Sequence, residues 1–208
     1  MEIARAAAGL FVRQGLRATR AEDIAQTAGI APRTFYRYFA TKEEAVAPLY
    51  AAGNERWADA VRTAPPALSV PEALEHGALH TLTPGVGVSH SSWTWVRPLI
   101  RMAESSSGLR RVWAEVCQAG EHTLAEVLAE RMAQADDIGT ARIPSVTSPE
   151  LRFAAAVASA AVRTAVEGWA FGEEPTGAAA QAGPADLALR NLRVLRHFPW
   201  TEIGGAAR

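Results

Sequence analysis

The segment from Thr34 to Lys42, TFYRYFATK, contains two tyrosines, two phenylalanines, an arginine and a lysine. On a helix, Phe35 and Phe39 are four residues apart and share one face, which suits a hydrophobic core. The tyrosine hydroxyls and the cations, with Arg33 just before them, fall on the opposite face. Arginine donates a fork of hydrogen bonds to guanine, and hydroxyl groups donate to phosphate oxygens. One face of this segment therefore has the chemistry of a DNA contact.

The charge of the chain is concentrated around this segment. Between Ala31 and Lys42 there are three cations and no acid, a charge of +3, whereas the whole chain carries −1. The other residues therefore carry −4. This balance excludes a uniformly basic nucleic-acid binder and favours a local basic patch on an otherwise acidic protein.

The residues around the basic patch predict three helices, at Met1–Gln14, Arg20–Ala28 and Pro32–Phe39. A capping box is expected at Thr19 and Glu22, in which the hydroxyl caps the glutamate amide and the carboxylate reaches back. Gly15 and Gly29 suit the left-handed residue that follows a helix. Pro32 suits the first position of a helix. Two short helices joined by a three-residue turn make a helix-turn-helix arrangement.

This arrangement assigns DNA contacts to both short helices. The residues expected at the contact are Arg20, Arg33, Thr34, Tyr36, Arg37, Tyr38 and Lys42, with Thr19 at the start of the first short helix. The helix ends at Arg20 and Lys42 also present free N–H groups, which suit phosphate. The alternative is a solvated charged face on an ordinary helical protein.

The segment from Gly29-Ile30-Ala31 through FYRYFATKE resembles the signature of TetR-family transcriptional regulators, and the resemblance covers about the first 50 residues. It implies that Thr34, Tyr36, Tyr38 and Lys42 hold phosphates. It implies that Pro32, Arg33 and Arg37 lie near bases or the adjacent backbone. One departure is Ala31, where that family often has serine, so the third helix lacks a side-chain cap worth about 1 kcal/mol.

The rest of the chain has helical periodicity and almost no strand signals, which predicts an all-α fold. A fourth helix is expected from a capping box at Thr41–Glu44 to about Thr63, bent at Pro48. The later helices are expected at Pro71–Leu82, Ser92–Glu104, Gly108–Ala133, Pro149–Phe171 and Ala185–Phe198. We expect a helix-turn-helix DNA-binding domain at residues 1–45 and a helical domain for effector binding and dimerisation at residues 46–208.

A single recognition helix buries too little surface for tight binding, so a homodimer on a palindromic operator is expected. The predicted interface is a stripe of small residues on the helix at Pro149–Phe171 with an apolar stripe on the last helix. Its members are Leu151, Ala154, Ala158, Ala161, Ala165, Trp169, Leu187, Leu192, Leu195 and Phe198. The alternative is that both helices belong to the core of one protomer.

The family resemblance also implies a pocket for a small effector, and apolar walls with a few polar groups suit a hydrophobic or aromatic ligand. The candidate wall residues are Trp57, His80, Trp93, Trp95, Leu99, Met102, Trp113, Cys117, His122 and Trp169. The alternative for each of these residues is core packing. A second alternative for the whole chain is a DNA-binding regulator without a small-molecule effector.

Other chemistries have weaker signals in this sequence. Glu72, His76 and His80 recur every four residues and could ligate a metal, but histidines four apart on a surface helix are usually solvated, and no metal or cofactor is expected. Cys117 is the single cysteine, so no internal disulfide forms. No phosphate-cradling glycine loop or nucleophile elbow occurs, so an enzyme, such as a helical-bundle oxygenase, is the less favoured class.

The sequence contains neither a signal peptide nor an apolar run long enough to span a bilayer, so a cytoplasmic protein without membrane contact is expected. Its expected partners are double-stranded DNA, a second copy of the chain and a small-molecule effector of unknown identity. The prediction is a DNA-binding transcriptional regulator that acts as a repressor.

Overall fold

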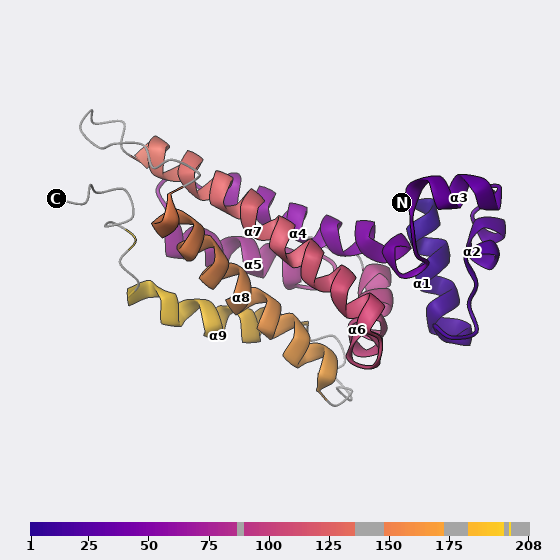
Figure 1. Cartoon of the computed structure of the whole chain (residues 1–208). Coiled ribbons are helices and arrows are strands. Elements are labelled where there is room, and N and C mark those ends of the chain that lie inside the picture. Colours follow the sequence, from indigo (N-terminus) through magenta and orange to yellow (C-terminus); the bar gives the residue numbers. More distant parts are fainter. Residues whose placement is uncertain (87–89, 136–147, 173–182, 198–199, 201–208) are drawn as a thin grey trace. The chain divides into compact units, whose positions relative to one another are not determined.

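The computed structural model describes residues 1–86, 90–135, 148–172, 183–197 and 200, and the regular elements in these ranges are helices, as predicted (Figure 1). The helices are α1 (Glu2–Gln14), α2 (Ala21–Thr27), α3 (Pro32–Tyr38), the 3-10 turn η1 (Glu43–Val46), α4 (Ala47–Arg62), α5 (Val70–Leu82), α6 (His90–Ser105), α7 (Ser107–Ala135), α8 (Pro149–Phe171), α9 (Ala185–Val194) and the 3-10 turn η3 (Leu195–His197). The loop predicted at 136–147 and most of the one at 172–184 lie outside the described residues.

The chain forms two compact units. The first contains Met1–Gly53 and Ser89–Val116, and the second contains Asn54–Val88 and Cys117–Arg208. Helices α4 and α7 therefore contribute residues to both units. Among the described residues, no helix is both long and apolar enough to cross a bilayer.

The core of the first unit is built by α1, which packs against α2, α6 and η1, while α2 packs against α3. Phe11, Ile24, Phe35 and Val46 are the large side chains that this arrangement buries almost completely. Their burial explains why the short helices α2 and α3 form, because helices of this length are not stable alone in water.

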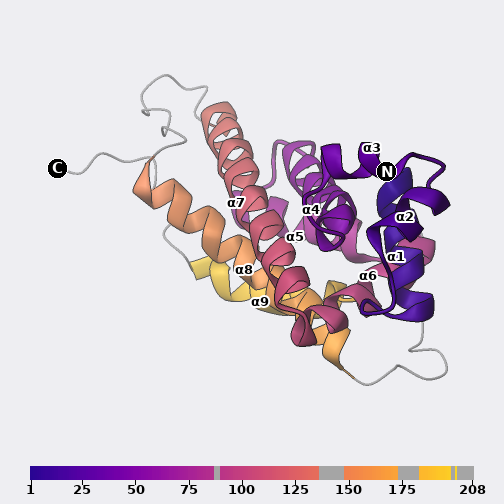
Figure 2. The ribbon, with the colours of Figure 1, turned by 45° about the vertical axis from the view of Figure 1, so that its right-hand side comes forward.

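In the second unit, α9 packs against both α5 and α8, and α8 and α9 lie side by side in both views (Figures 1 and 2). Polar contacts fix the position of α9. The Asn191 amide donates to the Ala161 carbonyl at 2.9 Å. Arg196, just beyond α9, binds the Glu75 carboxylate with two hydrogen bonds of 2.6 and 2.7 Å.

The buried Arg131 caps the C-terminal end of α4. Nη1 of Arg131, on α7, donates to the carbonyls of Val61 and Ala64 at 3.2 and 2.9 Å. Nη2 donates to the carbonyls of Pro65 and Leu68 at 3.1 and 3.0 Å. The carbonyls at a helix C-terminus carry partial negative charge and lack intrahelical donors, so the guanidinium satisfies both needs. Burial lowers the pKa of Arg131, but an arginine remains charged in proteins.

The start of α2 differs from the prediction. Arg20, not Thr19, is the N-cap residue, and its amide donates to Oδ2 of Asp23 at 2.8 Å. Thr19 is buried, and its hydroxyl donates to the Gly15 carbonyl at 2.9 Å. The predicted capping box between Thr19 and Glu22 is therefore wrong, because the acid that reaches back stands one residue later.

The start of α4 also differs. The 3-10 turn η1 precedes the helix, so Pro48 occupies the second position of α4 and not its interior. A proline in the first turn removes no intrahelical hydrogen bond, and the reason to expect a bend there disappears. The Glu44 carboxylate accepts from the Ala40 amide at 2.8 Å, whereas the Thr41 hydroxyl is buried and makes no hydrogen bond within the described residues.

Candidate nucleic-acid interface

The turn between α2 and α3 is fixed by backbone hydrogen bonds. Gly29 has a φ of 69°, and its amide donates to the Gln26 carbonyl at 3.1 Å. The next amide, of Ile30, donates to the Ala25 carbonyl at 2.9 Å. This is the Schellman arrangement, which favours glycine because a side chain is strained at positive φ. After this turn, α3 begins at Pro32.

Helix α3 has one buried and one exposed face, as the sequence predicted. Phe35 is 0% exposed and packs against the half-buried Phe39. The two ring centroids are 5.3 Å apart and the rings are tilted by 44°. Tyr36 and Tyr38 are 52% and 61% exposed. The remaining residues of the predicted contact on this helix, Pro32, Arg33 and Arg37, are exposed, and Thr34 is half-buried.

The two arginines of α3 differ in their surroundings. Arg37 lies over the ring of Tyr38 at 5.0 Å from the centroid, and its Nη2 donates to the Tyr38 hydroxyl at 3.2 Å. Arg33 makes no hydrogen bond or ion pair within the part of the chain that the structure describes. All five N–H groups of Arg33 are therefore available to a ligand.

A carboxylate joins α2 to α3 on the same surface. Oε1 of Glu22 accepts from the Tyr36 hydroxyl at 3.2 Å, and Oε2 lies 3.5 Å from Nε of Arg20. The hydrogen bond to Glu22 raises the pKa of Tyr36 above its ordinary value, so the hydroxyl keeps its proton. The sequence predicted Glu22 as part of a capping box with Thr19, and it did not predict the contacts of Glu22 with Tyr36 and Arg20.

Lys42 and Thr19 have structural roles that the sequence did not reveal. The ammonium of Lys42 donates to the carbonyls of Leu16 and Thr19, both at 2.7 Å, and so fastens the segment between α1 and α2. Two of its three N–H groups are used in this way. Thr19 is 1% exposed, so its side chain cannot reach a ligand, and we remove it from the expected contact.

The sequence of this segment matches a known family. A family model described as bacterial regulatory proteins of the TetR family matches residues 3–47, which run from α1 to the start of α4. This segment belongs to the TetR family. The helix-turn-helix of this family is formed here by α2 and α3.

Comparisons with characterised proteins agree with the TetR assignment. The HTH-type transcriptional regulator TcmR of Streptomyces glaucescens is 28% identical over 139 residues, which cover 62% of this chain and 58% of TcmR. The match therefore spans less than two thirds of the length of TcmR.

Solved structures of TetR-family proteins share the fold over nearly the whole chain. The TetR family repressor AlkX from Dietzia sp., implicated in biodegradation of n-alkanes, has a TM-score of 0.57 at 17% identity over 98% of each chain. Thermus thermophilus FadR, a TetR-family transcriptional repressor in complex with lauroyl-CoA, has a TM-score of 0.50 at 21% identity, covering 100% of this chain and 95% of FadR.

The predicted dimer stripe on α8 lies inside the protomer. Leu151, Ala154, Ala158 and Ala165 are at most 1% exposed, and Leu192 of α9 is equally buried. The prediction that these residues contact a second copy is wrong, because they pack within the second unit. Ala161, Trp169, Leu187 and Leu195 are half-buried, and Phe198 lies outside the described residues.

A different stripe of α8 is accessible. It consists of Phe153, Val157, Ala160, Thr164, Gly168 and Phe171, which follow each other at helical spacing. Phe153 and Phe171, at its two ends, are 59% and 46% exposed. On the neighbouring α9, Val194 is 74% exposed.

The predicted effector residues divide between the two units. In the first unit, Trp95 lies against α1 at Gly9, and Trp113 packs edge-on against Tyr50 at 4.9 Å between centroids, while Leu99 is fully buried. Trp93 and Met102 of the same unit are half-buried.

In the second unit, Trp57 is buried and Cys117 and Trp169 are half-buried. His80 is exposed, and the side chain of His122 is 67% exposed beside Glu126. These two histidines therefore do not line an interior pocket, although their sequence spacing was compatible with one.

The alternative chemistries find little support in this geometry. The Glu72 carboxylate accepts from the amide and hydroxyl of Ser69 at 2.9 and 2.6 Å, which caps α5 and lowers the pKa of Glu72. The described residues contain no cluster of three or more metal-ligating side chains. Burial raises the pKa of Cys117 to about 12, so its thiol is protonated and unreactive at neutral pH.

Proposed function

We propose that this chain is a repressor that binds a palindromic operator as a homodimer through α3 and is released by a small hydrophobic or aromatic effector. The observation that carries the DNA-binding part is the exposed face of α3, which combines two arginines and two tyrosines. The Schellman turn and the burial of Phe35 hold this face in one orientation. A rigid element of this kind enters a major groove with little loss of conformational freedom.

The surface supports a division of roles among its side chains. Arg33 has a free guanidinium and suits the bidentate contact to guanine, and Arg37 suits a second base or the adjacent backbone. Tyr36, Tyr38 and Thr34 suit phosphate oxygens, as do Arg20 and the third N–H of Lys42. The phosphate contacts set the register of the helix, and the arginines determine the preferred sequence.

Replacing Arg33 by alanine tests this division. The variant is expected to lose about 1–3 kcal/mol of discrimination at one base pair in each half-site, because the fork to guanine is removed. Arg37→Ala is expected to relax a different position. The measurement is selection of bound fragments from a random duplex library, with Arg5→Ala on the exposed side of α1 as the matched control. Sequence logos identical to the parent for both α3 variants would refute base contact.

We expect the Glu22 carboxylate to compete with DNA phosphates for the Tyr36 hydroxyl and the Arg20 guanidinium, because it contacts both of these groups. Glu22→Gln is expected to strengthen binding to every duplex by about threefold to tenfold and to steepen the salt dependence by up to about one unit. The control is Glu55→Gln, an exposed residue of α4 that makes the same change in net charge. If the two variants bind equally in a filter-binding titration, Glu22 has no competing role.

The dimer is proposed to form through the accessible stripe of α8, with Val194 of α9 beside it. Small residues at the centre of the stripe let two helices approach to about 8–10 Å, and the phenylalanines at its ends supply apolar area. Two-fold pairing would place two copies of α3 on successive half-sites.

The effector part is supported by buried polar atoms in the second unit. The Trp57 indole N–H and the Thr81 hydroxyl are buried, and neither has a hydrogen-bond partner within the described residues. Such groups cost about 1–3 kcal/mol each unless a ligand or water satisfies them. The lauroyl-CoA in the FadR structure is an example of an amphipathic ligand in this fold.

The release mechanism follows from the position of α4, which contributes to both units. A ligand that fits one arrangement of the two units better than the other shifts their equilibrium by its differential affinity. The test is the melting-temperature shift produced by a panel of small hydrophobic and aromatic compounds, followed by DNA release. A hit that acts on the parent and not on Trp57→Phe supports the site. A hit that acts equally on both contradicts it.

A further inference from the structure

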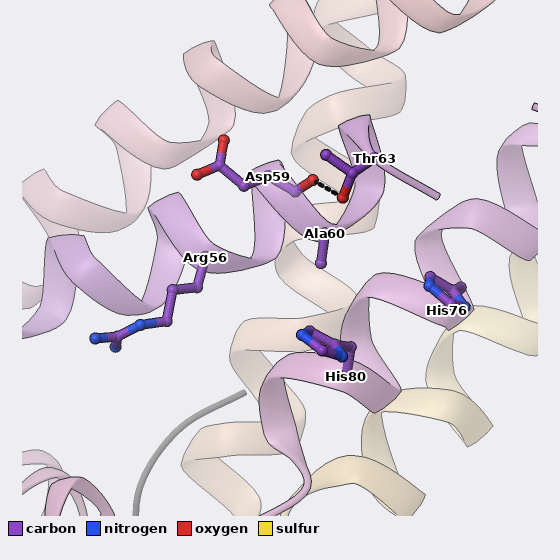
Figure 3. A pocket seen from close by; sticks show the side chains of 6 residues that line it. All are labelled: Arg56, Asp59, Ala60, Thr63, His76 and His80. Atoms are coloured by element: carbon purple, nitrogen blue, oxygen red, sulfur yellow. Dashed lines mark hydrogen bonds between the residues drawn. The ribbon is translucent and has the colours of Figure 1, made fainter. Parts of the chain in front are cut away.

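An open groove of about 280 Å³ lies between α4 and α5 in the second unit, and nothing in the DNA-binding account uses it. Its lining residues are Arg56, Asp59, Ala60, Thr63, His76 and His80. Figure 3 shows the histidines on α5, and Arg56, Asp59 and Ala60 on α4 with Thr63 just after its end. Ala60 contributes only a methyl group, which leaves room between the longer side chains.

Three nitrogen-bearing side chains of this groove are available to a ligand. Arg56, His76 and His80 are exposed, and none of them makes a hydrogen bond or ion pair within the described residues. Each imidazole donates at least one N–H in either protonation state, and the guanidinium donates from five. The two histidines are four residues apart on one helix, so they present their rings on the same side.

The acids near these donors are all held by other partners. Asp59 pairs with Arg62 on its own helix, and Figure 3 shows its carboxylate turned away from both imidazoles. On α5, Glu72 is held by Ser69, and Glu75 by Arg196. Arg56 therefore forms no ion pair with Asp59, the acid among the lining residues.

We propose that this groove binds a small organic anion with a carboxylate or phosphate group. Arg56 supplies the fixed charge and a planar fork, and the two histidines supply further N–H donors around the same space. The volume is at the lower end of the range for small-molecule sites, which limits the ligand to a few carbon atoms. A transition metal is the less suitable occupant, because the cationic guanidinium repels it and only two imidazole ligands are present.

The direct test is a nuclear magnetic resonance titration of the histidine ring signals at pH 7. Sodium phosphate and sodium succinate are added in separate arms, and sodium chloride at equal ionic strength is the reference. The rings of His76 and His80 are expected to shift together along one saturable curve, while His122, exposed on α7, does not follow it. Saturation by phosphate alone assigns a phosphate ester, and saturation by succinate alone assigns a carboxylic acid.

Variants separate a built site from general attraction. Arg56→Gln is expected to weaken binding about tenfold, since it removes a charge-assisted pair. Arg152→Gln, an exposed arginine of α8 outside the groove, is expected to have no effect. Equal shifts at His122, an unchanged affinity in Arg56→Gln, or a response of both rings to Ni²⁺ but to neither anion would overturn the proposal. DNA does not enter this experiment, so its outcome is independent of the proposed function.

Discussion

Arg131→Met is expected to lower the free energy of unfolding by about 3 kcal/mol. The substitution removes four hydrogen bonds to carbonyls. Those of Val61 and Pro65 keep a backbone amide donor, whereas the buried Ala64 carbonyl loses its donor, and an unpaired buried group costs about 1–3 kcal/mol. Methionine fills similar space, so the loss reports hydrogen bonds more than volume. For a chain of this size the melting temperature is expected to fall by roughly 6–12 °C.

Arg62, which pairs with Glu130 beside Arg131 in the chain, provides the control. Arg62 bonds with Asp59 and Glu130, but its side chain is 37% exposed, and exposed ion pairs contribute about 0–1 kcal/mol. Arg62→Met should therefore change the unfolding energy by no more than about 1 kcal/mol. Arg131→Lys keeps the charge without the planar fork and is expected to fall between the two. Denaturant titrations at one fixed protein concentration give these values, and equal losses in the two methionine variants would contradict the capping role.

Ala160→Arg is expected to convert the protein from a dimer to a monomer. Ala160 lies at the centre of the accessible stripe of α8, where a long charged side chain prevents close approach of a second helix. Arginine is a good helix former, so the protomer should keep its fold. Light scattering should report about 44 kDa for the parent, twice the 22.2 kDa of one chain, and 22.2 kDa for the variant.

The same variant should bind operator DNA about 100-fold more weakly or worse. A monomer contacts one half-site and loses the effective concentration that links the second contact to the first. Ala119→Arg, at an exposed position of α7, is the matched control and should remain dimeric with unchanged affinity. A dimer mass and full affinity for Ala160→Arg would show that the proposed surface is not the interface.

Local chemistry explains what the sequence could predict. Gly15, Gly29 and Pro32 act on the adjacent backbone, so the ends of α1, α2 and α3 were within one residue of their predicted positions. The division of α3 into a buried and an exposed face followed from the spacing of Phe35 and Phe39 alone. Ser148 likewise acts locally, because it stands just before α8 and accepts from the Leu151 amide at 3.1 Å.

The features that the sequence did not predict are contacts between residues that are far apart in the chain. Helix α8 is rich in alanine on every side, so periodicity could not tell the buried Ala158 from the accessible Ala160. Arg131 finds its acceptors more than sixty residues earlier, and no local pattern marks an arginine that will be buried. The family resemblance implied a phosphate contact for Lys42, and its bonds to Leu16 and Thr19 required the fold.

The salt dependence of DNA binding is the sharpest test of the proposal that α3 is a DNA-reading helix. A selected duplex is titrated with purified protein between about 50 and 300 mM salt, and the logarithm of the association constant is plotted against the logarithm of the salt concentration. A dimer that presents Arg20 and Lys42 to phosphates twice predicts a slope of about −4, because each of the four neutralised phosphates contributes about −0.9. A slope near zero, or no binding at the lowest salt, would contradict the assignment of α3 as a DNA-reading helix.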